Sequence, residues 1–424
     1  MLAFATDVPV GRLILFCAAS AFALLTTLVA QDLDLLIKGG HVIDPKNGLN
    51  GVMDVGITAG KIVRVAPDIP ASSARRTVAA TDLYVVPGLI DIHVHVFHGA
   101  DPDAAYSNGP NAVVPDGFTF RSGVTTVVDT GSPGWRNFPQ FKRQVVDASR
   151  TRVLALLNIV GNGMRGDPYE QDLTDMDAKL TAARVGAYRD VLVGVKVAHY
   201  SGAEWDPVDR AVEAGKLAQV PVMVDFGGHQ PELSLESLLL EHLRPGDIFT
   251  HMYAAVRGRI PITDEKGRVR PYVRKARERG IIFDVGHGGG SFFWGQAVPA
   301  VKEGFLPDVI STDLHRGSMN AGMKDMLNVM SKMLNLGMPV DQAIAASTWR
   351  PAQCIKRLDL GHLSAGTIAD VTVLRLREGD FGFIDASGKS LPGRLKLESE
   401  LTVREGAVVW DLNGIAAEKW HQGN

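Results

Sequence analysis

The sequence has little cysteine and no excess of charge of either sign. Only two of its 424 residues are cysteine, Cys17 and Cys354. Cys17 lies in an apolar N-terminal segment, so a chain cut after that segment would hold one cysteine and no internal disulfide. The formal net charge is −3, and Lys and Arg form no run. We therefore expect no nucleic-acid partner.

Long apolar runs are equally scarce, because only one stretch approaches the length of a membrane span. It runs from Leu13 to about Ala30, behind Arg12. Residues 1–30 are therefore interpreted as a signal peptide or an N-terminal anchor. A signal peptide would make the protein periplasmic or secreted. An uncleaved segment would anchor it to a membrane, and an over-long start would leave it cytoplasmic.

Both ends of the chain carry short strand-like runs separated by turn residues. Near the N-terminus these runs are broken by Gly39-Gly40, Pro45 and Gly60. Residues 366–410 show the same pattern of short strand-like runs. Hydrophobic residues make up 46% of the chain, enough for a sizeable core. We predict a small β-sandwich domain built from both chain ends, residues 31–87 and 357–424.

Between these ends, residues 88–356 alternate strand-like and helix-like segments. Residues 175–190 and 273–280 have helical patterns. Eight strands with helical crossovers indicate the α/β class, and specifically a (β/α)8 barrel of the TIM type. The predicted strands are 88–96, 123–131, 152–161, 191–200, 220–228, 247–253, 281–290 and 308–315.

Ionisable side chains stand where the predicted strands end, which is where such barrels place their chemistry. In the first strand, Asp91, His93 and His95 share one face because successive side chains alternate. One histidine alone is typical of a core residue bonded to a carbonyl. A metal ion would satisfy several such groups together. The candidate metal ligands are His93, His95, Lys196, Asp225, His251 and Asp313.

Lys196 is expected to point into the barrel, because the valines on either side of it suit the helix-packed face. A lysine there could reach solvent or pair with a carboxylate. A desolvated lysine with a lowered pKa can instead be neutral and react with carbon dioxide. The product is a carbamate, an anionic ligand whose two oxygens can bridge two metals.

These motifs together resemble those of the amidohydrolase superfamily. The similarity is narrower to the amidohydrolase/deacetylase metallohydrolases, which are often labelled dihydroorotases. It rests on "PGLIDIHVHVF", "GVKV", "THMY", "DVGHGGGSF", "STDLH" and "GHLSAGTIADVTVL". The resemblance implies a distorted barrel with a β-sandwich, a carbamylated Lys196 and two divalent metals, usually Zn²⁺. It also implies that His93, His95 and Asp313 hold a buried metal and His251 a more exposed one.

One position departs from the family pattern. The ligand of the fifth strand is normally histidine, and Asp225 stands in its place. We expect Asp225 to be the ligand, with His229 as the alternative and a supporting hydrogen bond as a third reading of Asp225. An oxygen ligand here would shift preference from zinc toward manganese.

For catalysis, Asp313 is expected to take the proton of the attacking water and return it to the leaving group. Phe97 stands where dihydroorotases carry an arginine, which argues against dihydroorotate. The resemblance implies hydrolysis of an acylated small molecule, such as an N-acyl amino acid or an acetylated hydroxy acid. His287 is predicted either to contact the substrate, where it is also a catalytic candidate, or to stabilise its loop. The candidates near the cavity mouth, each with an ordinary surface position as the alternative, are His199, Tyr253, Arg165 and Arg316.

Two other functions stay open from the sequence. A cyclic-amide hydrolase, like a dihydroorotase or a hydantoinase, would use the same metal ligands to cleave an amide bond within a ring. A catalytically silent barrel would bind or assemble without turnover, although five of the six ligand positions keep the family's residue. The oligomeric state is left open.

Overall fold

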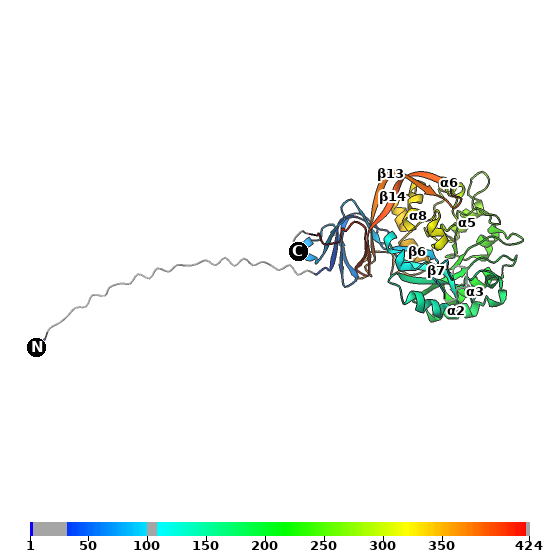
Figure 1. The fold of residues 1–424 in the computed structure, drawn as a ribbon, viewed down its shortest axis with the longest axis horizontal. Coiled ribbons are helices and arrows are strands. Elements are labelled where there is room, and N and C mark those ends of the chain that lie inside the picture. Colours follow the sequence, from blue (N-terminus) through cyan, green and yellow to red (C-terminus); the bar gives the residue numbers. More distant parts are fainter. Residues whose placement is uncertain (3–31, 100–107, 421–424) are drawn as a thin grey trace. The chain divides into compact units, whose positions relative to one another are not determined.

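The computed structural model describes residues 1–2, 32–99 and 108–420 (Figure 1). The predicted N-terminal segment therefore lies outside the described residues, apart from its first two. The described residues from Asp32 onward belong to one compact unit. Within the described part of the chain, no helix has both the length and the apolar character needed to cross a membrane.

The centre of this unit is a seven-stranded parallel sheet in which strand order follows chain order. Its strands are buried on both faces, which explains their near-continuous runs of Val, Ile and Leu. The strands are β6 (Leu89–Val94), β7 (Val124–Gly134), β8 (Arg152–Asn158), β9 (Leu192–Val197), β10 (Val222–Val224), β11 (Ile248–Phe249) and β12 (Ile282–Phe283).

The predicted eighth strand, residues 308–315, is not a regular strand, and this expectation is corrected. The segment instead makes two isolated parallel bridges, Asp284 with Val309 and Val94 with Leu314. The backbone N–H of His95 donates to the carbonyl of Leu314 at 2.8 Å. Asp313 has a φ of 51°, a left-handed conformation that interrupts an extended strand. The segment still links β12 to β6, so the strands close into the expected (β/α)8 barrel.

Helices connect the strands of the barrel (Figure 1). The two helical patterns identified in the sequence are confirmed as α2 and α5. The helices are α1 (Phe138–Phe141), α2 (Ala178–Ala187), α3 (Asp206–Ala218), α4 (Leu235–Ser237), α5 (Pro271–Glu278), α6 (Trp294–Lys302), α7 (Arg316–Asn320), α8 (Met326–Asn335), α9 (Val340–Ala345) and α10 (Trp349–Cys354).

Strands from both chain ends form a second, eight-stranded sheet, as predicted. Pairing is antiparallel except that β1 runs parallel to β4 and β5. A bulge at Gly39 and Gly40 lets β1 pair with both, and Gly39 adopts the φ of 73° that a side chain would disfavour. The strands are β1 (Leu35–Asp44), β2 (Leu49–Thr58), β3 (Lys61–Ala66), β4 (Thr77–Ala79), β5 (Tyr84–Pro87), β13 (Val371–Ile384), β14 (Ser390–Arg404) and β15 (Ala407–Asp411).

The hairpin of β13 and β14 is longer than the rest of this sheet and reaches the barrel. Figure 1 shows it extending from the β-rich end of the unit toward α8 and α6. Phe383 and Leu397, near the hairpin's far end, belong to the barrel's hydrophobic core, and β14 packs against α8. The two sheets are thus joined by packing as well as by chain connections.

Candidate metal centre

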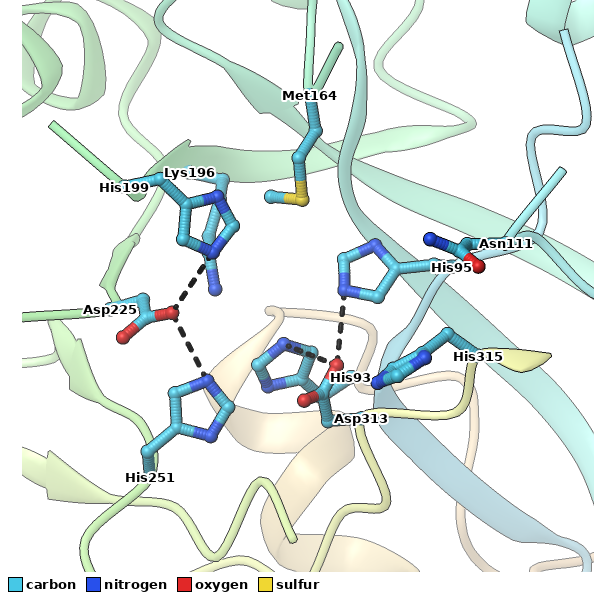
Figure 2. A pocket seen from close by; sticks show the side chains of 10 residues that line it. All are labelled: His93, His95, Asn111, Met164, Lys196, His199, Asp225, His251, Asp313 and His315. Carbon is cyan, nitrogen blue, oxygen red and sulfur yellow. Dashed lines mark ion pairs between the residues drawn. The ribbon is translucent and has the colours of Figure 1, made fainter. Parts of the chain in front are cut away.

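A cavity opens where the barrel strands end, and ionisable side chains form most of its wall (Figure 2). All six candidate ligands predicted from the sequence contribute to it. His93 and Lys196 are strand residues, Asp225 directly follows β10, and His251 lies two residues after the end of β11. The lining residues are His93, His95, Asn111, Met164, Lys196, His199, Asp225, His251, Asp313 and His315.

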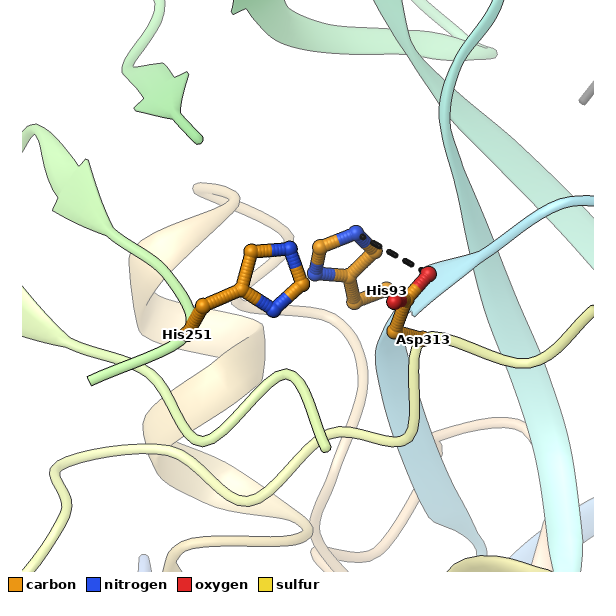
Figure 3. Close-up of side chains that lie close together, drawn as sticks. All are labelled: His93, His251 and Asp313. Carbon is orange, nitrogen blue, oxygen red and sulfur yellow. Dashed lines mark ion pairs between the residues drawn. The ribbon is translucent and has the colours of Figure 1, made fainter. Parts of the chain in front are cut away.

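Three of these side chains are placed to share a single ion (Figure 3). His93, His251 and Asp313 each offer one ligand atom, and these atoms all lie within 4.8 Å of one another. His95 adjoins the group, because its Nε2 lies 3.1 Å from Oδ1 of Asp313. Two imidazoles and a carboxylate are ligand types that zinc accepts.

The backbone at this site is held in an uncommon conformation at three points. His199, His251 and Asp313 have φ values of 58°, 58° and 51°. A non-glycine residue in this left-handed region costs about 1–3 kcal/mol, which the surrounding packing must supply. Strain of this kind collects at functional sites.

The imidazole of His251 is oriented by a backbone carbonyl. Its Nδ1 lies 2.5 Å from the carbonyl oxygen of Gly286. A carbonyl only accepts hydrogen bonds, so Nδ1 carries the hydrogen and the lone pair of Nε2 faces the cavity. This is the tautomer that a metal ligand requires.

His93 and His95 are each oriented by a hydroxyl that is backed by a buried aspartate. Nδ1 of His93 lies 3.0 Å from Oγ1 of Thr250, and that hydroxyl donates to Oδ2 of Asp284 at 2.7 Å. Thr250 therefore accepts from His93. Nδ1 of His95 likewise lies 3.0 Å from Oγ of Ser132, whose side chain is hydrogen-bonded to Asp129.

The two buried aspartates differ from surface carboxylates because they are cut off from solvent. Burial raises the pKa of Asp284 to about 6 and also raises that of Asp129. Burial also lowers the pKa of His93 well below its usual range, with a smaller contribution from the charge of Lys196. A lowered pKa favours the neutral imidazole, which is the form that binds a cation.

Lys196 is 1% exposed, and Figure 2 shows its side chain at the cavity wall. Burial lowers the pKa of its amine, while the carboxylates of Asp225 and Asp313 oppose that shift. A lowered pKa increases the fraction of neutral amine at a given pH.

Asp225 sits between several cationic or potentially cationic groups. It is ion-paired with Arg259 through Oδ1, and its Oδ2 lies 3.3 Å from Nε2 of His251 and 3.5 Å from Nε2 of His199. Burial alone would raise the pKa of Asp225, but Arg259 and then His251 hold it well below its usual range. Oδ2 is thus the oxygen that faces the cavity's histidines.

His199 is fixed from its other side by Glu170, a carboxylate that is 1% exposed. The distance from Nδ1 of His199 to Oε1 of Glu170 is 2.9 Å. Burial opposes protonation here, but Asp225 and Glu170 together raise the pKa of His199 to about 10.

Three residues predicted near the site are not brought to the cavity wall. His229 packs its ring on Phe226, with centroids 4.8 Å apart, because the chain turns at Gly227 and Gly228. Tyr253 is fully buried and its hydroxyl points at the carbonyl of Phe305, 3.4 Å away. His287 is fully buried and bonds Lys332. Tyr253 and His287 therefore do not line this cavity, and the substrate contacts expected of them stay predictions.

The two arginines proposed near the mouth do not line the cavity either. Arg165 lies over the ring of Tyr169, 3.9 Å from its centroid. Arg316 begins α7 and donates its backbone N–H to the carbonyl of Asn111. Phe97, by contrast, is buried against Phe141 as its apolar character suggests.

Several residues of the site were missed in the sequence. Asp129 and Asp284 each follow a buried strand run, and that pattern could have identified them. His315 follows Asp313 by two residues, and its Nδ1 accepts from the backbone N–H groups of Gly317 and Ser318. Others gave no signal in the sequence. Arg259, Asn111 and Met164 stand in loops, and Glu170 lies in a three-residue 3-10 helix, Tyr169–Gln171.

Comparison with known proteins places this geometry in a family. The Amidohydrolase family matches residues 84–223 and 295–397. A deacetylase of Agrobacterium fabrum is 34% identical over 337 residues, which cover 78% of this chain and 79% of the relative. A structure described as an adenine deaminase superposes with a TM-score of 0.79 at 28% identity, covering 90% of this chain and all of the other. A structure described as a dihydroorotase gives a TM-score of 0.77 at 31% identity, covering 89% of this chain and 99% of the other. The chain therefore belongs to the amidohydrolase family.

Proposed function

We propose that this protein is a metal-dependent hydrolase that cleaves the amide or ester bond of an acylated small molecule. N-acyl amino acids and acetylated hydroxy acids are the proposed substrates. The observation that carries the proposal is the convergence of His93, His251 and Asp313 beside His95 and Lys196. The deacetylase name of the Agrobacterium fabrum relative supports the reaction class.

The donor set fits two divalent ions, with Zn²⁺ the expected metal and Mn²⁺ the alternative. His93 and His251 present free Nε2 lone pairs, because their Nδ1 atoms are committed to Thr250 and Gly286. Nitrogen and carboxylate ligands suit zinc, and the additional carboxylate oxygen of Asp225 also suits manganese. Asp225 and His251 would hold the second ion, because Oδ2 of Asp225 faces Nε2 of His251.

Lys196 is proposed to carry a carbamate that contributes to both metal sites. The neutral amine would attack the carbon of carbon dioxide, forming an N–C bond and releasing one proton. Burial of the amine favours the neutral form that this step needs. The buried side chain of Lys196 would then carry a negative charge and offer two oxygen ligands.

When bound, the metals lower the pKa of a water molecule and polarise the carbonyl of the substrate. The protein's own contribution is proton transfer by Asp313. Burial would raise the pKa of this carboxyl, but His93, His95 and His251 hold it well below its usual range, so it is ionised. An ionised Asp313 can accept a proton and return it to the leaving amine or alcohol.

His315 is proposed to donate a hydrogen bond to the substrate. Its Nδ1 accepts from two backbone N–H groups, so the neutral ring carries its hydrogen on Nε2. The ring lines the cavity beside Asp313 (Figure 2). His199 lines the opposite part of the cavity and is proposed as a second substrate contact.

A cyclic-amide hydrolase is the second candidate, because one similar structure is described as a dihydroorotase. Phe97 argues against dihydroorotate as the substrate. This side chain is buried and apolar, whereas an arginine at this position would bind the carboxylate of dihydroorotate. The two candidates differ in whether the bond that is cleaved lies in a ring.

The test is a hydrolysis screen of metal-loaded protein against N-acetyl amino acids of both hands, acetylated hydroxy acids, hydantoins and dihydropyrimidines. We expect turnover of an acylated compound, abolished by a chelator and restored by Zn²⁺ or Mn²⁺. Turnover of ring compounds alone would favour the second candidate. A protein that binds metal but turns over none of these compounds would support the silent barrel.

A further inference from the structure

A lysine is fully buried in the barrel wall, on α8, outside the cavity. Lys332 is 0% exposed, and its Nζ makes three hydrogen bonds. It donates to the carbonyls of Gly322 and Ile384, each at 2.7 Å, and contacts Nε2 of His287 at 2.6 Å. A lysine ammonium has three hydrogens, so these acceptors satisfy it completely.

His287 is the acceptor in that third bond. Its Nδ1 lies 2.8 Å from the carbonyl oxygen of Gly288 and therefore carries the ring hydrogen, which leaves Nε2 as a lone pair toward Lys332. Burial, and then the charge of Lys332, lower the pKa of His287 well below its usual range. The ring also stacks on Phe292, with centroids 4.6 Å apart and planes 6° apart.

The backbone on either side of His287 supports two of the candidate metal ligands. Gly286 provides the carbonyl that orients His251 at 2.5 Å. Gly288 donates its N–H to the carbonyl of Thr312 at 2.9 Å, and a Cβ at Gly288 would lie 2.3 Å from Oδ2 of Asp313. A small shift of residues 286–288 would thus displace both His251 and Asp313.

The same lysine also connects this segment to the β13–β14 hairpin. Ile384, whose carbonyl accepts from Lys332, is the last residue of β13. The hairpin turn is bonded to the barrel at further points nearby. Ala386 donates its N–H to the carbonyl of Phe292 at 2.9 Å, and Nε1 of Trp294 donates to the carbonyl of Lys389 at 3.0 Å.

We propose that Lys332 and His287 are positioning residues of the metal centre. Together they hold residues 286–288 against His251 and Asp313, so that metal affinity depends on the bond between Lys332 and His287. This inference rests on the proposed function, because it needs a metal at that site. It differs from a purely structural role, which would lower stability without a specific loss of metal affinity.

The chain offers a matched control on the same helix. Asn335 lies one turn after Lys332 and also fastens α8 to the hairpin, donating to the carbonyl of Leu395 and accepting from the N–H of Arg394, both at 2.7 Å. It has no bond to residues 286–288. Asn335→Ala should therefore weaken the same interface without reaching the metal ligands.

The experiment compares the apparent Zn²⁺ dissociation constants of wild-type protein, Lys332→Met and Asn335→Ala, measured against a chelating dye. Each measurement is made at a temperature well below the unfolding midpoint of that variant. Loss of a group that supports metal ligands typically weakens binding by roughly 10–100-fold. We expect a weakening in that range for Lys332→Met and less than about twofold for Asn335→Ala. Equal affinities in the two variants would overturn the inference.

A second pair of variants decides the matter if Lys332→Met does not fold. His287→Gln retains an acceptor for Lys332 and should keep near wild-type Zn²⁺ affinity, whereas His287→Leu should lose it. Equal affinity in these two variants would also contradict the positioning role. A wild-type protein that binds neither Zn²⁺ nor Mn²⁺ would overturn the proposed function and this inference together, whereas metal-binding wild type with unaffected variants would overturn only the inference.

Discussion

Oδ2 of Asp225 lies 3.3 Å from Nε2 of His251, which places this carboxylate beside another candidate metal ligand. His229, the alternative ligand of this strand, instead packs on Phe226. Asp225→Ala should therefore remove close to one metal per chain, whereas His229→Ala should leave the metal content near that of wild type. Elemental analysis of the two purified variants checks this. The reverse order would identify His229 as the ligand.

Lys196 gives a prediction about chemical modification. Lys196→Ala removes the only proposed ligand shared by both metals, so we expect loss of activity and of most bound metal. Short carboxylic acids should restore part of both, because they supply the two missing oxygens. Mass spectrometry of the intact native protein is the complementary measurement, and an unmodified lysine in an active, metal-loaded protein would rule the carbamate out.

Asp313 is the proposed proton carrier. Asp313→Asn preserves the shape of the side chain but cannot accept the proton, so turnover should fall by roughly 10²–10⁴-fold while the fold is kept. The acidic limb of the pH–rate profile should disappear with the carboxylate. Normal turnover in a fully metallated variant would place the proton transfer on another residue.

His199 predicts a pH dependence of stability in the metal-free protein. Its pKa is raised from 6.5 to about 10 by Asp225 and Glu170, against the effect of burial. A group with a raised folded pKa stabilises the protein fully below its unfolded pKa, and this contribution is lost as pH rises through the folded value. The stability gap between wild type and His199→Gln should therefore shrink between pH 6.5 and about 10. A gap that does not change over this range would contradict the ion pairs at His199.

The barrel and the side chains that line its cavity could be predicted because each of the six candidate ligands closes an apolar strand run. Lys196 is the clearest example, since the valines around it left its side chain only the barrel interior. The eighth segment was predicted as a strand for the same reason. The left-handed backbone at Asp313 prevents regular pairing there, and its sequence gives no sign of that conformation.

Other parts of the site could not be predicted because their partners are far apart in the sequence. Arg259 lies in a loop and Glu170 in a short 3-10 helix, and the polar residues around both resemble ordinary surface. Arg259 nevertheless pairs with Asp225, and Glu170 pairs with His199. His287 was predicted at the substrate because it follows a strand run. Its side chain turns the other way and meets Lys332, 45 residues later on α8.

The metal content of the purified wild-type protein tests the central claim most directly. The protein is expressed with Zn²⁺ and Mn²⁺ supplied, and elemental analysis is compared with that of His93→Ala, which loses one of the three side chains that converge on one ion. We predict close to two metals per chain for the wild type and a clear loss in the variant. A wild-type protein without metal, or a variant with unchanged metal content, would contradict the account.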